Sequence, residues 1–202
     1  MRRLLALVLI LLIATPALAQ APSLRETALA LHNEARAKVG APPLAWDPKL
    51  AAAAAVWARE LGRRDRMEHS PWENRRGQGE NLSMGARGYF SDAVLMRSWF
   101  AEADDYRPGV FPEVSRTGRW QDVGHYTQAI WRGTTAIGCA RGSSRTQDYL
   151  VCRYSPPGNM LGQRVHLSPA HKPNLRPAGA MSRRSVAASV WNGTCDQSGQ
   201  KA

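Results

Sequence analysis

A histidine and a glutamine three residues apart give this chain its first candidates for chemistry. His125 and Gln128 lie in the run Gly-His-Tyr-Thr-Gln-Ala-Ile-Trp at 124–131. The hydrophobic spacing predicts a short helix over 122–132, and residues three apart share one face of a helix. An imidazole is a metal ligand and a proton carrier, although a lone helical histidine is more often a core or surface residue. The run therefore predicts a polar site on this helix.

A carboxylate interrupts the apolar stripe of another predicted helix, over 91–106. Leu95, Trp99, Glu102 and Tyr106 are spaced so that they fall on one line along the helix. A carboxylate that points inward must be paired, bound to a metal or protonated, because burying it alone is too costly. Alternatively, Glu102 borders the stripe and reaches solvent. Helix geometry leaves both interpretations open.

A second histidine and a second carboxylate lie outside the predicted helices. His69 is in the loop Met-Glu-His-Ser-Pro, and Glu80 precedes a short predicted strand at 81–84, with glycines beside it. Those glycines let the backbone pass close to another group. None of the four residues named so far, the two histidines and the two glutamates, has the local spacing of a metal motif, such as two histidines one helical turn apart. Spacing alone does not join the four into a site.

Two cysteines flank a segment that reads as a β-hairpin. Strand-like residues at 136–139 and 149–152 bracket a turn-rich segment at 141–145. A hairpin centred on that loop places Cys139 opposite or nearly opposite Cys152, so a disulfide between them is expected in an oxidising compartment. Cys195 is left over, either as a free thiol or as an intermolecular link.

Two longer helices are predicted in the first third of the chain. The first covers 23–39, with Gly40 as its stop. The second opens with Asp47 as N-cap and Pro48 as the first helical residue, and its apolar face ends before Gly62.

Composition divides the chain into three parts. Residues 1–19 have the charged start, apolar core and small-residue end of a secretory signal, whose core is too short to span a bilayer. Residues 20–162 are long enough for one domain, and 163–202 form a basic tail that we expect to be disordered. The formal net charge is +11. No cluster of arginines alternates with stacking aromatic residues, so we expect no nucleic-acid partner. No segment after residue 19 is apolar enough to cross a membrane, so we expect no integral membrane span.

Several motifs together make the chain resemble the CAP superfamily of cysteine-rich secretory proteins, antigen 5 and pathogenesis-related 1 proteins. They occur in the family's order and cover about residues 24 to 162. They are the stretches at 32–36, 79–82, 99–106, 124–131 and 149–159. The Ala- and Arg-rich composition is typical of a bacterial, SCP-like extracellular member. The resemblance implies an α+β fold, a three-layer α-β-α sandwich with a small, mostly antiparallel sheet and one large cleft.

The resemblance also implies which residues meet in that cleft. The family's two histidines and two glutamates correspond here to His69, Glu80, Glu102 and His125, and Gln128 is expected beside them. Relatives with a bound divalent ion use the histidines as ligands, so His69 and His125 would bind Zn²⁺ or another divalent cation. Neutral imidazoles suit zinc in an open site that also holds water.

Three functions follow from these expectations. The first is a secreted or periplasmic, non-enzymatic protein that binds a metal or a small ligand in the cleft. The second is a metal-dependent hydrolase or peptidase, with Glu80 or Glu102 as catalytic base, or a serine mechanism using Ser70 or Ser83. The third and least supported is a sterol or lipid carrier that uses the loop at 107–120. Oligomeric state is left open.

Overall fold

The computed structural model describes residues 21–166, and the predicted signal segment, residues 167–202 of the predicted basic tail and Cys195 lie outside them. Within this range no helix is long and apolar enough to cross a membrane. In chain order the elements are α1 (Leu24–Lys38), β1 (Ala45–Trp46), α2 (Pro48–Arg64), η1 (Trp72–Asn74), β2 (Gly79–Ala86), α3 (Asp92–Ala101), η2 (Glu102–Asp104), η3 (Trp120–Val123), α4 (Gly124–Ala129), β3 (Ala136–Ser143) and β4 (Gln147–Ser155).

The first two helices begin close to where the sequence predicts, and each is capped by a side chain. Ser23 and Glu26 form a reciprocal capping box at the start of α1. Asp47 accepts hydrogen bonds from the backbone N–H groups of Lys49 and Leu50 at the start of α2. The apolar face of α2 ends at Leu61, but the helix itself continues through Gly62 to Arg64. A Cβ at Gly62 would lie 2.4 Å from the carbonyl oxygen of Ser143, so this glycine serves close packing of the helix on β3.

The two helices that carry the candidate site are shorter than predicted. The α-helix α3 ends at Ala101, and Glu102 begins a separate 3₁₀ turn. Likewise α4 spans only Gly124–Ala129 and follows the 3₁₀ turn η3. The expected stripe still packs inward, since Leu95, Trp99 and Tyr106 are buried.

The four strands form one mixed sheet in the order β1-β3-β4-β2. β1 pairs with β3 in parallel, and the other two pairings are antiparallel. The strand predicted at 81–84 is the middle of the longer β2, which lies at one edge of the sheet. The two-residue β1 was not predicted, because two residues are too few for a periodic pattern.

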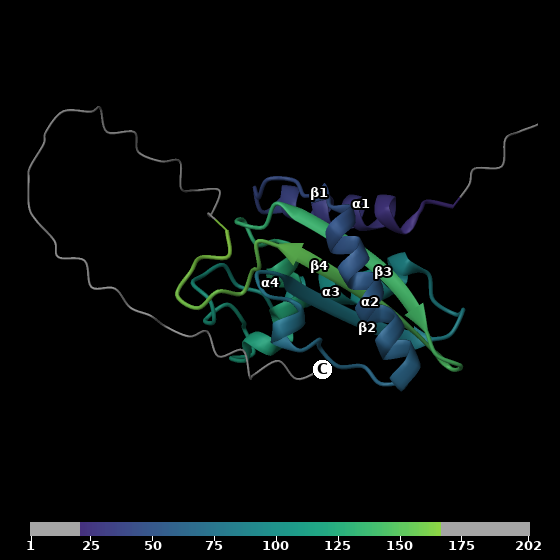
Figure 1. Cartoon of the computed structure of the whole chain (residues 1–202). Helices are drawn as coiled ribbons and strands as arrows, with labels where there is room; N and C mark the ends of the chain where they lie inside the picture. Colours follow the sequence, from purple (N-terminus) through teal and green to yellow (C-terminus); the bar gives the residue numbers. More distant parts are fainter. Residues whose placement is uncertain (1–20, 167–202) are drawn as a thin grey trace, which may run out of the picture.

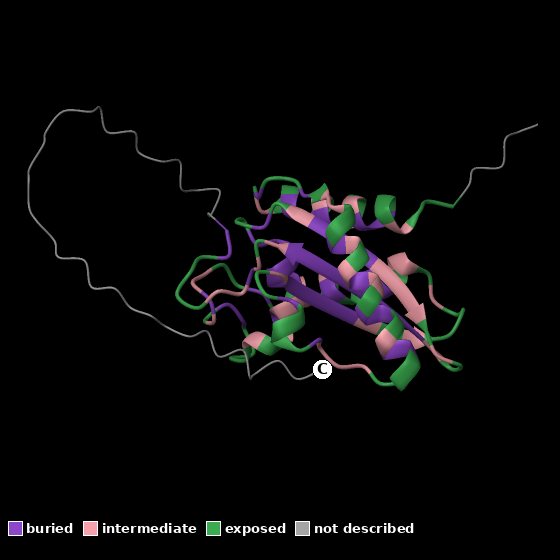
Figure 2. Cartoon of the chain, in the orientation of Figure 1, coloured by how far each residue is buried: buried purple, intermediate pink, exposed green. Residues whose placement is uncertain are grey.

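Alternation along β4 builds the two faces of the sheet. Leu150, Cys152 and Tyr154 pack in one hydrophobic cluster with residues of α1 and α3. Tyr149 and Val151 pack in another cluster with residues of α2. Figure 1 shows α2 crossing one face of the sheet, and Figure 2 shows the buried colour running along β4 between the helical layers. The expected α-β-α sandwich with a mostly antiparallel sheet is therefore confirmed.

The predicted disulfide is present within this sheet. Cys139 of β3 and Cys152 of β4 are direct cross-strand partners with Cα atoms 4.1 Å apart, and their sulfurs are bonded. Both side chains are buried among residues of α1 and α3. The bond therefore ties the two central strands together in the core.

The packed chain extends past the predicted boundary at residue 162. Residues 160–166, which we call the C-terminal strap, lie against the loop around Phe111. The Phe111 N–H donates to the carbonyl of Gln163, and the Phe111 carbonyl accepts from the Gly162 N–H. The donor–acceptor distance is 2.9 Å in each case. Val165 is fully buried and His166 is nearly so. The strap therefore belongs to the domain.

Candidate functional site

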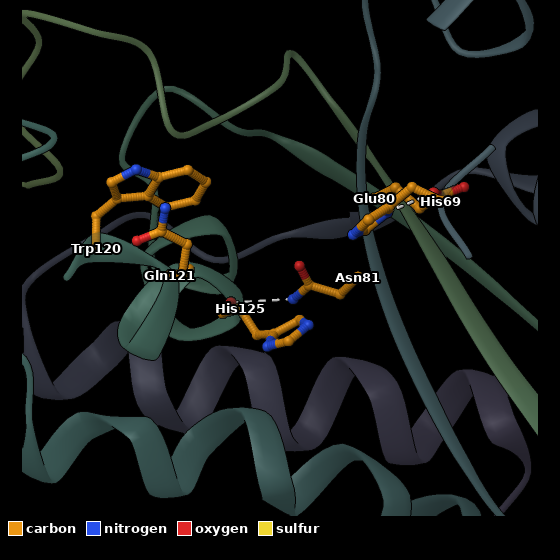
Figure 3. A pocket seen from close by; sticks show the side chains of 7 residues that line it. His69, Glu80, Asn81, Trp120, Gln121 and His125 are labelled. Atoms are coloured by element: carbon orange, nitrogen blue, oxygen red, sulfur yellow. Dashed lines mark hydrogen bonds and ion pairs between the residues drawn. The ribbon is translucent and has the colours of Figure 1, made fainter. Parts of the chain in front are cut away.

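A small cleft lies beside the edge strand β2, where the sheet meets α4. Its volume is about 30 Å³, enough for one or two water-sized groups. Figure 3 shows its labelled side chains. Those lining it are His69, Glu80, Asn81, Trp120, Gln121, Gly124 and His125. Three of the four residues implied by the resemblance therefore meet at one cleft.

His69 and Glu80 form one half of the site. His69 Nδ1 lies 2.7 Å from Glu80 Oε1, and the same oxygen accepts from the Ser70 backbone N–H at 3.0 Å. The other oxygen, Oε2, accepts from the Ser70 hydroxyl at 2.9 Å. Arg153 Nε lies 3.0 Å from Oε2, an ion-pair distance without hydrogen-bond alignment. The Glu80 side chain has no exposed surface.

The partners of Glu80 keep this buried carboxyl group ionised. Burial by itself raises its pKa, but the hydrogen bond from His69 and the charge of Arg153 outweigh that effect. The result is a pKa below the ordinary value for glutamate. Glu80 is therefore a fixed negative charge at the wall of the cleft.

His125 and Glu102 form the other half, with a similar design. His125 Nδ1 lies 2.6 Å from Glu102 Oε1, and the Tyr126 backbone N–H donates to Glu102 Oε2 at 3.0 Å. Glu102 is 18% exposed and does not line the cleft. The inward interpretation of Glu102 is thus correct in part: its charge is paired with His125 and stands behind that ring.

Asn81 connects the two halves across the edge strand. Its Nδ2 donates to the backbone carbonyl of His125 at 3.0 Å and to the Tyr154 hydroxyl at 3.1 Å. In Figure 3 its side chain lies between His125 and the His69–Glu80 pair. Because neighbouring residues of a strand point to opposite faces, Glu80 reaches Arg153 on the α2 side while Asn81 reaches Tyr154 on the other. One edge strand thus presents both halves.

Gln128 does not reach the cleft, so its predicted place there is wrong. It is 3% exposed, and its Oε1 accepts from the Gly158 backbone N–H at 2.8 Å. Its Nε2 donates to the Thr134 hydroxyl at 3.3 Å. Helix periodicity placed Gln128 on the same face as His125. Its side chain instead turns toward the Pro-Pro-Gly-Asn loop at 156–159 and is hydrogen bonded to that loop.

Sequence reasoning missed Asn81, Trp120 and Arg153 as site residues. A signal for Arg153 was available, because it interrupts the apolar run of β4 just as Glu102 interrupts its stripe. Asn81 and Trp120 carried no comparable signal. Their roles depend on which elements meet at the edge of the sheet.

The hydrogen bonds of the two histidines fix their tautomers. Carboxylate oxygens only accept, so Nδ1 of His69 and of His125 carries a proton, and in the neutral ring Nε2 then carries the lone pair. Among residues 21–166 neither Nε2 atom has a hydrogen-bond partner, and both rings line the cleft. A carboxylate at Nδ1 is the arrangement typical of metal-binding histidines.

The donor set is nevertheless incomplete. Within the described residues no group of three or more histidine, cysteine, aspartate or glutamate side chains is placed to hold a metal ion. The two Nε2 atoms could supply two ligands, and a cleft of about 30 Å³ leaves room for water to complete the shell. The two imidazoles alone would therefore need water or another ligand to complete the coordination of a metal ion.

Comparison with known proteins places the chain among relatives. Pathogenesis-related protein 1C of Nicotiana tabacum is 37% identical over 134 residues, covering 65% of this chain and 74% of the tobacco protein. Pathogenesis-related protein PRMS of Zea mays is 35% identical over 171 residues, covering 80% of this chain and 96% of the maize protein.

Solved structures show the same fold. The crystal structure of NaASP2 with Zn²⁺ superimposes with a TM-score of 0.61 at 25% identity, covering 71% of this chain and 85% of that one. A family model described as the cysteine-rich secretory protein family, CAP, matches residues 29–154, which is more than half of the sequence. The relatives, the fold and the family model agree, and the chain belongs to the CAP family.

Proposed function

We propose that this chain is an exported, non-enzymatic protein that binds one divalent cation, with Zn²⁺ as the first candidate. Nε2 of His69 and Nε2 of His125 would be the protein ligands, and water or a small ligand would fill the remaining positions. One observation carries the proposal: each histidine donates a hydrogen bond from Nδ1 to a buried or half-buried carboxylate, and among the described residues its Nε2, at the cleft, has no hydrogen-bond partner.

Physical chemistry and a relative support this choice. A carboxylate behind an imidazole orients the ring and raises the basicity of its free nitrogen, which strengthens metal binding. NaASP2, which shares the fold, has been crystallised with Zn²⁺. With two protein ligands the site would bind more weakly than a closed structural zinc site, which has four.

The test is a titration of the full, metal-free protein with Zn²⁺ by isothermal calorimetry. We expect one equivalent to bind to the wild type, and none to the cleft when His69 and His125 are both replaced by alanine. Gln121→Ala is the matched control, because Gln121 lines the same cleft without a metal-binding ring. Equal zinc binding by the double variant and by wild type would overturn the proposal.

The non-enzymatic assignment rests on how fully the hydroxyl and carboxyl groups are engaged. Ser70 donates to Glu80 and accepts from Arg153, so its hydroxyl is not poised on a histidine. Glu80 has no exposed surface, and Glu102 stands behind His125. Metal-dependent cleavage of a peptide library by wild type, lost in Glu102→Gln, would replace this assignment with a hydrolase.

The loop expected of a lipid carrier is packed against the domain. Phe111 is 3% exposed, and its ring meets the rings of Trp120 and Trp131 edge-on. We therefore do not favour lipid carriage by this loop. Comigration of labelled sterol with the protein, lost in Phe111→Ala but not in Val110→Ala, would reinstate it.

Export is part of the proposal. The family is described as secretory, and a disulfide between Cys139 and Cys152 persists in oxidising compartments. We expect the exported protein to begin at Gln20, after removal of residues 1–19, which intact-mass measurement of protein from the periplasm or medium can check. A mass that includes those residues would contradict this expectation.

A further inference from the structure

A third histidine lies beneath the cleft, in the middle of the core. His32 of α1 has no exposed surface. Its ring contacts three aromatic rings, with centroids 6.3 Å from Trp99, 5.1 Å from Phe100 and 5.6 Å from Tyr154. A polar ring in such surroundings is costly unless both nitrogens are hydrogen bonded. Both are.

The hydrogen bonds of His32 have one consistent direction. Nδ1 lies 2.8 Å from the carbonyl oxygen of Ala28, which can only accept, so Nδ1 carries the proton. In the neutral ring Nε2 is then an acceptor. The Tyr154 hydroxyl, 2.8 Å from Nε2, must be the donor.

The same direction continues to the cleft. While the Tyr154 O–H donates to His32, the Tyr154 oxygen accepts from Asn81 Nδ2, which also donates to the backbone carbonyl of His125. That carbonyl fixes the orientation of the amide, because a flipped Asn81 would place oxygen against oxygen. A relay therefore runs from His125 through Asn81 and Tyr154 to His32, with every donor matched to an acceptor.

A packing route runs parallel to this relay. The indole of Trp99 meets the ring of His32 at its edge and stacks on the ring of His125, with an interplanar angle of 17° and centroids 6.2 Å apart. Trp99 Nε1 donates to the Leu82 carbonyl of β2 at 2.9 Å, which holds the indole in place. Hydrogen bonds and packing thus both connect His32 to His125.

We propose that His32 is a positioning residue for the cleft, acting through Tyr154 and Asn81 on the placement of His125. Neutral His32 accepts a hydrogen bond from the Tyr154 hydroxyl, and the lone pairs of the tyrosine oxygen accept from Asn81. Asn81 in turn holds the backbone of His125, so that the ring presents Nε2 to the cleft. For the bound cation this proposal rests on the proposed function; for the free protein it does not.

The surroundings of His32 favour the neutral ring. Its neighbours in α3 and β4 are the aromatic residues named above, and the charged group of its own helix that faces it is Arg36. Burial lowers the pKa of His32 to about 4, the Ala28 carbonyl opposes this shift, and the positive charge of Arg36 adds to it.

The test compares two tyrosines of one strand. Tyr154→Phe removes only the hydroxyl that links His32 to Asn81. Tyr149→Phe is the matched control: it makes the same change in β4, but its hydroxyl donates to Asp65 and its ring packs on the α2 side of the sheet. The first readout is the NMR signals of the His125 ring in metal-free protein, and the second is Zn²⁺ affinity.

We expect Tyr154→Phe to shift the His125 ring signals and to weaken Zn²⁺ binding about tenfold, at the low end for loss of an outer-shell partner. Tyr149→Phe should change neither. If both variants lose stability alike while the His125 signals and zinc affinity stay unchanged, His32 is only a core residue and the proposal fails. If wild type binds no zinc but the His125 signals still shift, the metal function fails and the positioning role stands.

A measurement on the unaltered protein guards against misfolding of the variant. Nitrogen-15 shifts of the imidazoles report the tautomer of each histidine. We expect His32 to carry its proton on Nδ1 and an unprotonated Nε2. A proton on Nε2 would reverse the hydrogen bond with Tyr154 and overturn the proposal.

Discussion

At the scale of single residues, the two glutamates of the site share a design but differ in environment. Each accepts a histidine Nδ1 and a backbone N–H. Glu80 also faces the buried Arg153, whereas Glu102 is partly exposed and has no arginine at ion-pair distance among the described residues. Removing the charge of each should therefore have different consequences.

We expect Glu80→Gln to reduce the free energy of unfolding by about 3 kcal/mol, because it leaves the buried Arg153 without a counter-charge. Glu102→Gln should cost about 1 kcal/mol, since a hydrogen bond weakens but no buried charge is left unpaired. Urea denaturation at neutral pH measures both. Equal losses would show that Arg153 gains little from Glu80.

His32 predicts a dependence of stability on pH. Its pKa is about 4 in the folded protein and 6.5 as an ordinary histidine. Between these values the unfolded chain binds more protons, so the stabilisation is complete above pH 6.5 and is lost as the pH falls toward 4. We expect the free energy of unfolding to fall by about 3 kcal/mol across this range.

The effect of His32 can be separated from that of the carboxylates in two ways, by the pH range in which it acts and by the variant His32→Gln. Asp148, whose pKa is lowered to about 2 by hydrogen bonds from Arg141 and Ser143 that outweigh its burial, loses its contribution only below about pH 4. His32→Gln should be less stable at pH 7 and show a flatter profile between pH 6.5 and 4. A profile as steep as that of wild type would assign the pH dependence to other groups.

At the scale of elements, local signals predicted where α1 and α2 begin and where the hairpin lies. Capping of α2 by Asp47 is set by neighbouring residues, so the sequence alone predicted it, whereas the capping box of Ser23 at the start of α1 was seen only in the structure. The end of α2 was different. Gly62 lies inside the helix, where the absence of a side chain lets β3 pack closely against it.

The candidate site was predictable only through the family resemblance. Its histidines lie in the loop after α2 and in α4, and its glutamates in β2 and η2, so no local spacing relates them. The misplacement of Gln128 has the same cause. Periodicity gives the face of a helix, but not which neighbouring loop a long side chain will hold.

The side chain of Gln128 lies so close to Gly79 of β2 that residue 79 is predicted to tolerate no side chain. A Cβ at Gly79 would lie 2.0 Å from Gln128 Oε1, far inside contact distance. We expect Gly79→Ala to lower the free energy of unfolding by about 2 kcal/mol, because the amide must leave the Gly158 N–H that it holds.

A double-mutant cycle with Gln128→Ala checks this cause. Gln128→Ala also loses the hydrogen bond with the Gly158 N–H, but it removes the side chain that would clash with a Cβ at residue 79. We expect the double variant to be more stable than the sum of the two single losses predicts. Strict additivity would mean that Gly79→Ala acts through the strand backbone instead.

At the scale of the whole molecule, the cleft joins the two helical layers through one edge strand. The loop that carries His69 is tied to α2 by the hydrogen bond from Trp57 Nε1 to the Glu68 carbonyl, at 3.0 Å. His125 belongs to the opposite layer, where it stacks on Trp99. Relative movement of the layers would therefore change the separation of the two imidazoles, so the stability of the sandwich and the geometry of the cleft are linked.

The C-terminal strap contributes to that stability beyond the predicted domain boundary. Val165 has no exposed surface and packs in the cluster that contains Tyr126 of α4, while the Arg132 N–H donates to its carbonyl at 2.8 Å. We expect Val165→Ala to reduce the free energy of unfolding by about 2 kcal/mol, from lost burial and the cavity left behind. Leu161→Ala is the matched control in the same strap, because Leu161 is 66% exposed and should cost under about 0.5 kcal/mol. Urea denaturation measures both, and similar losses would show that the strap is held by its backbone hydrogen bonds and not by the buried valine.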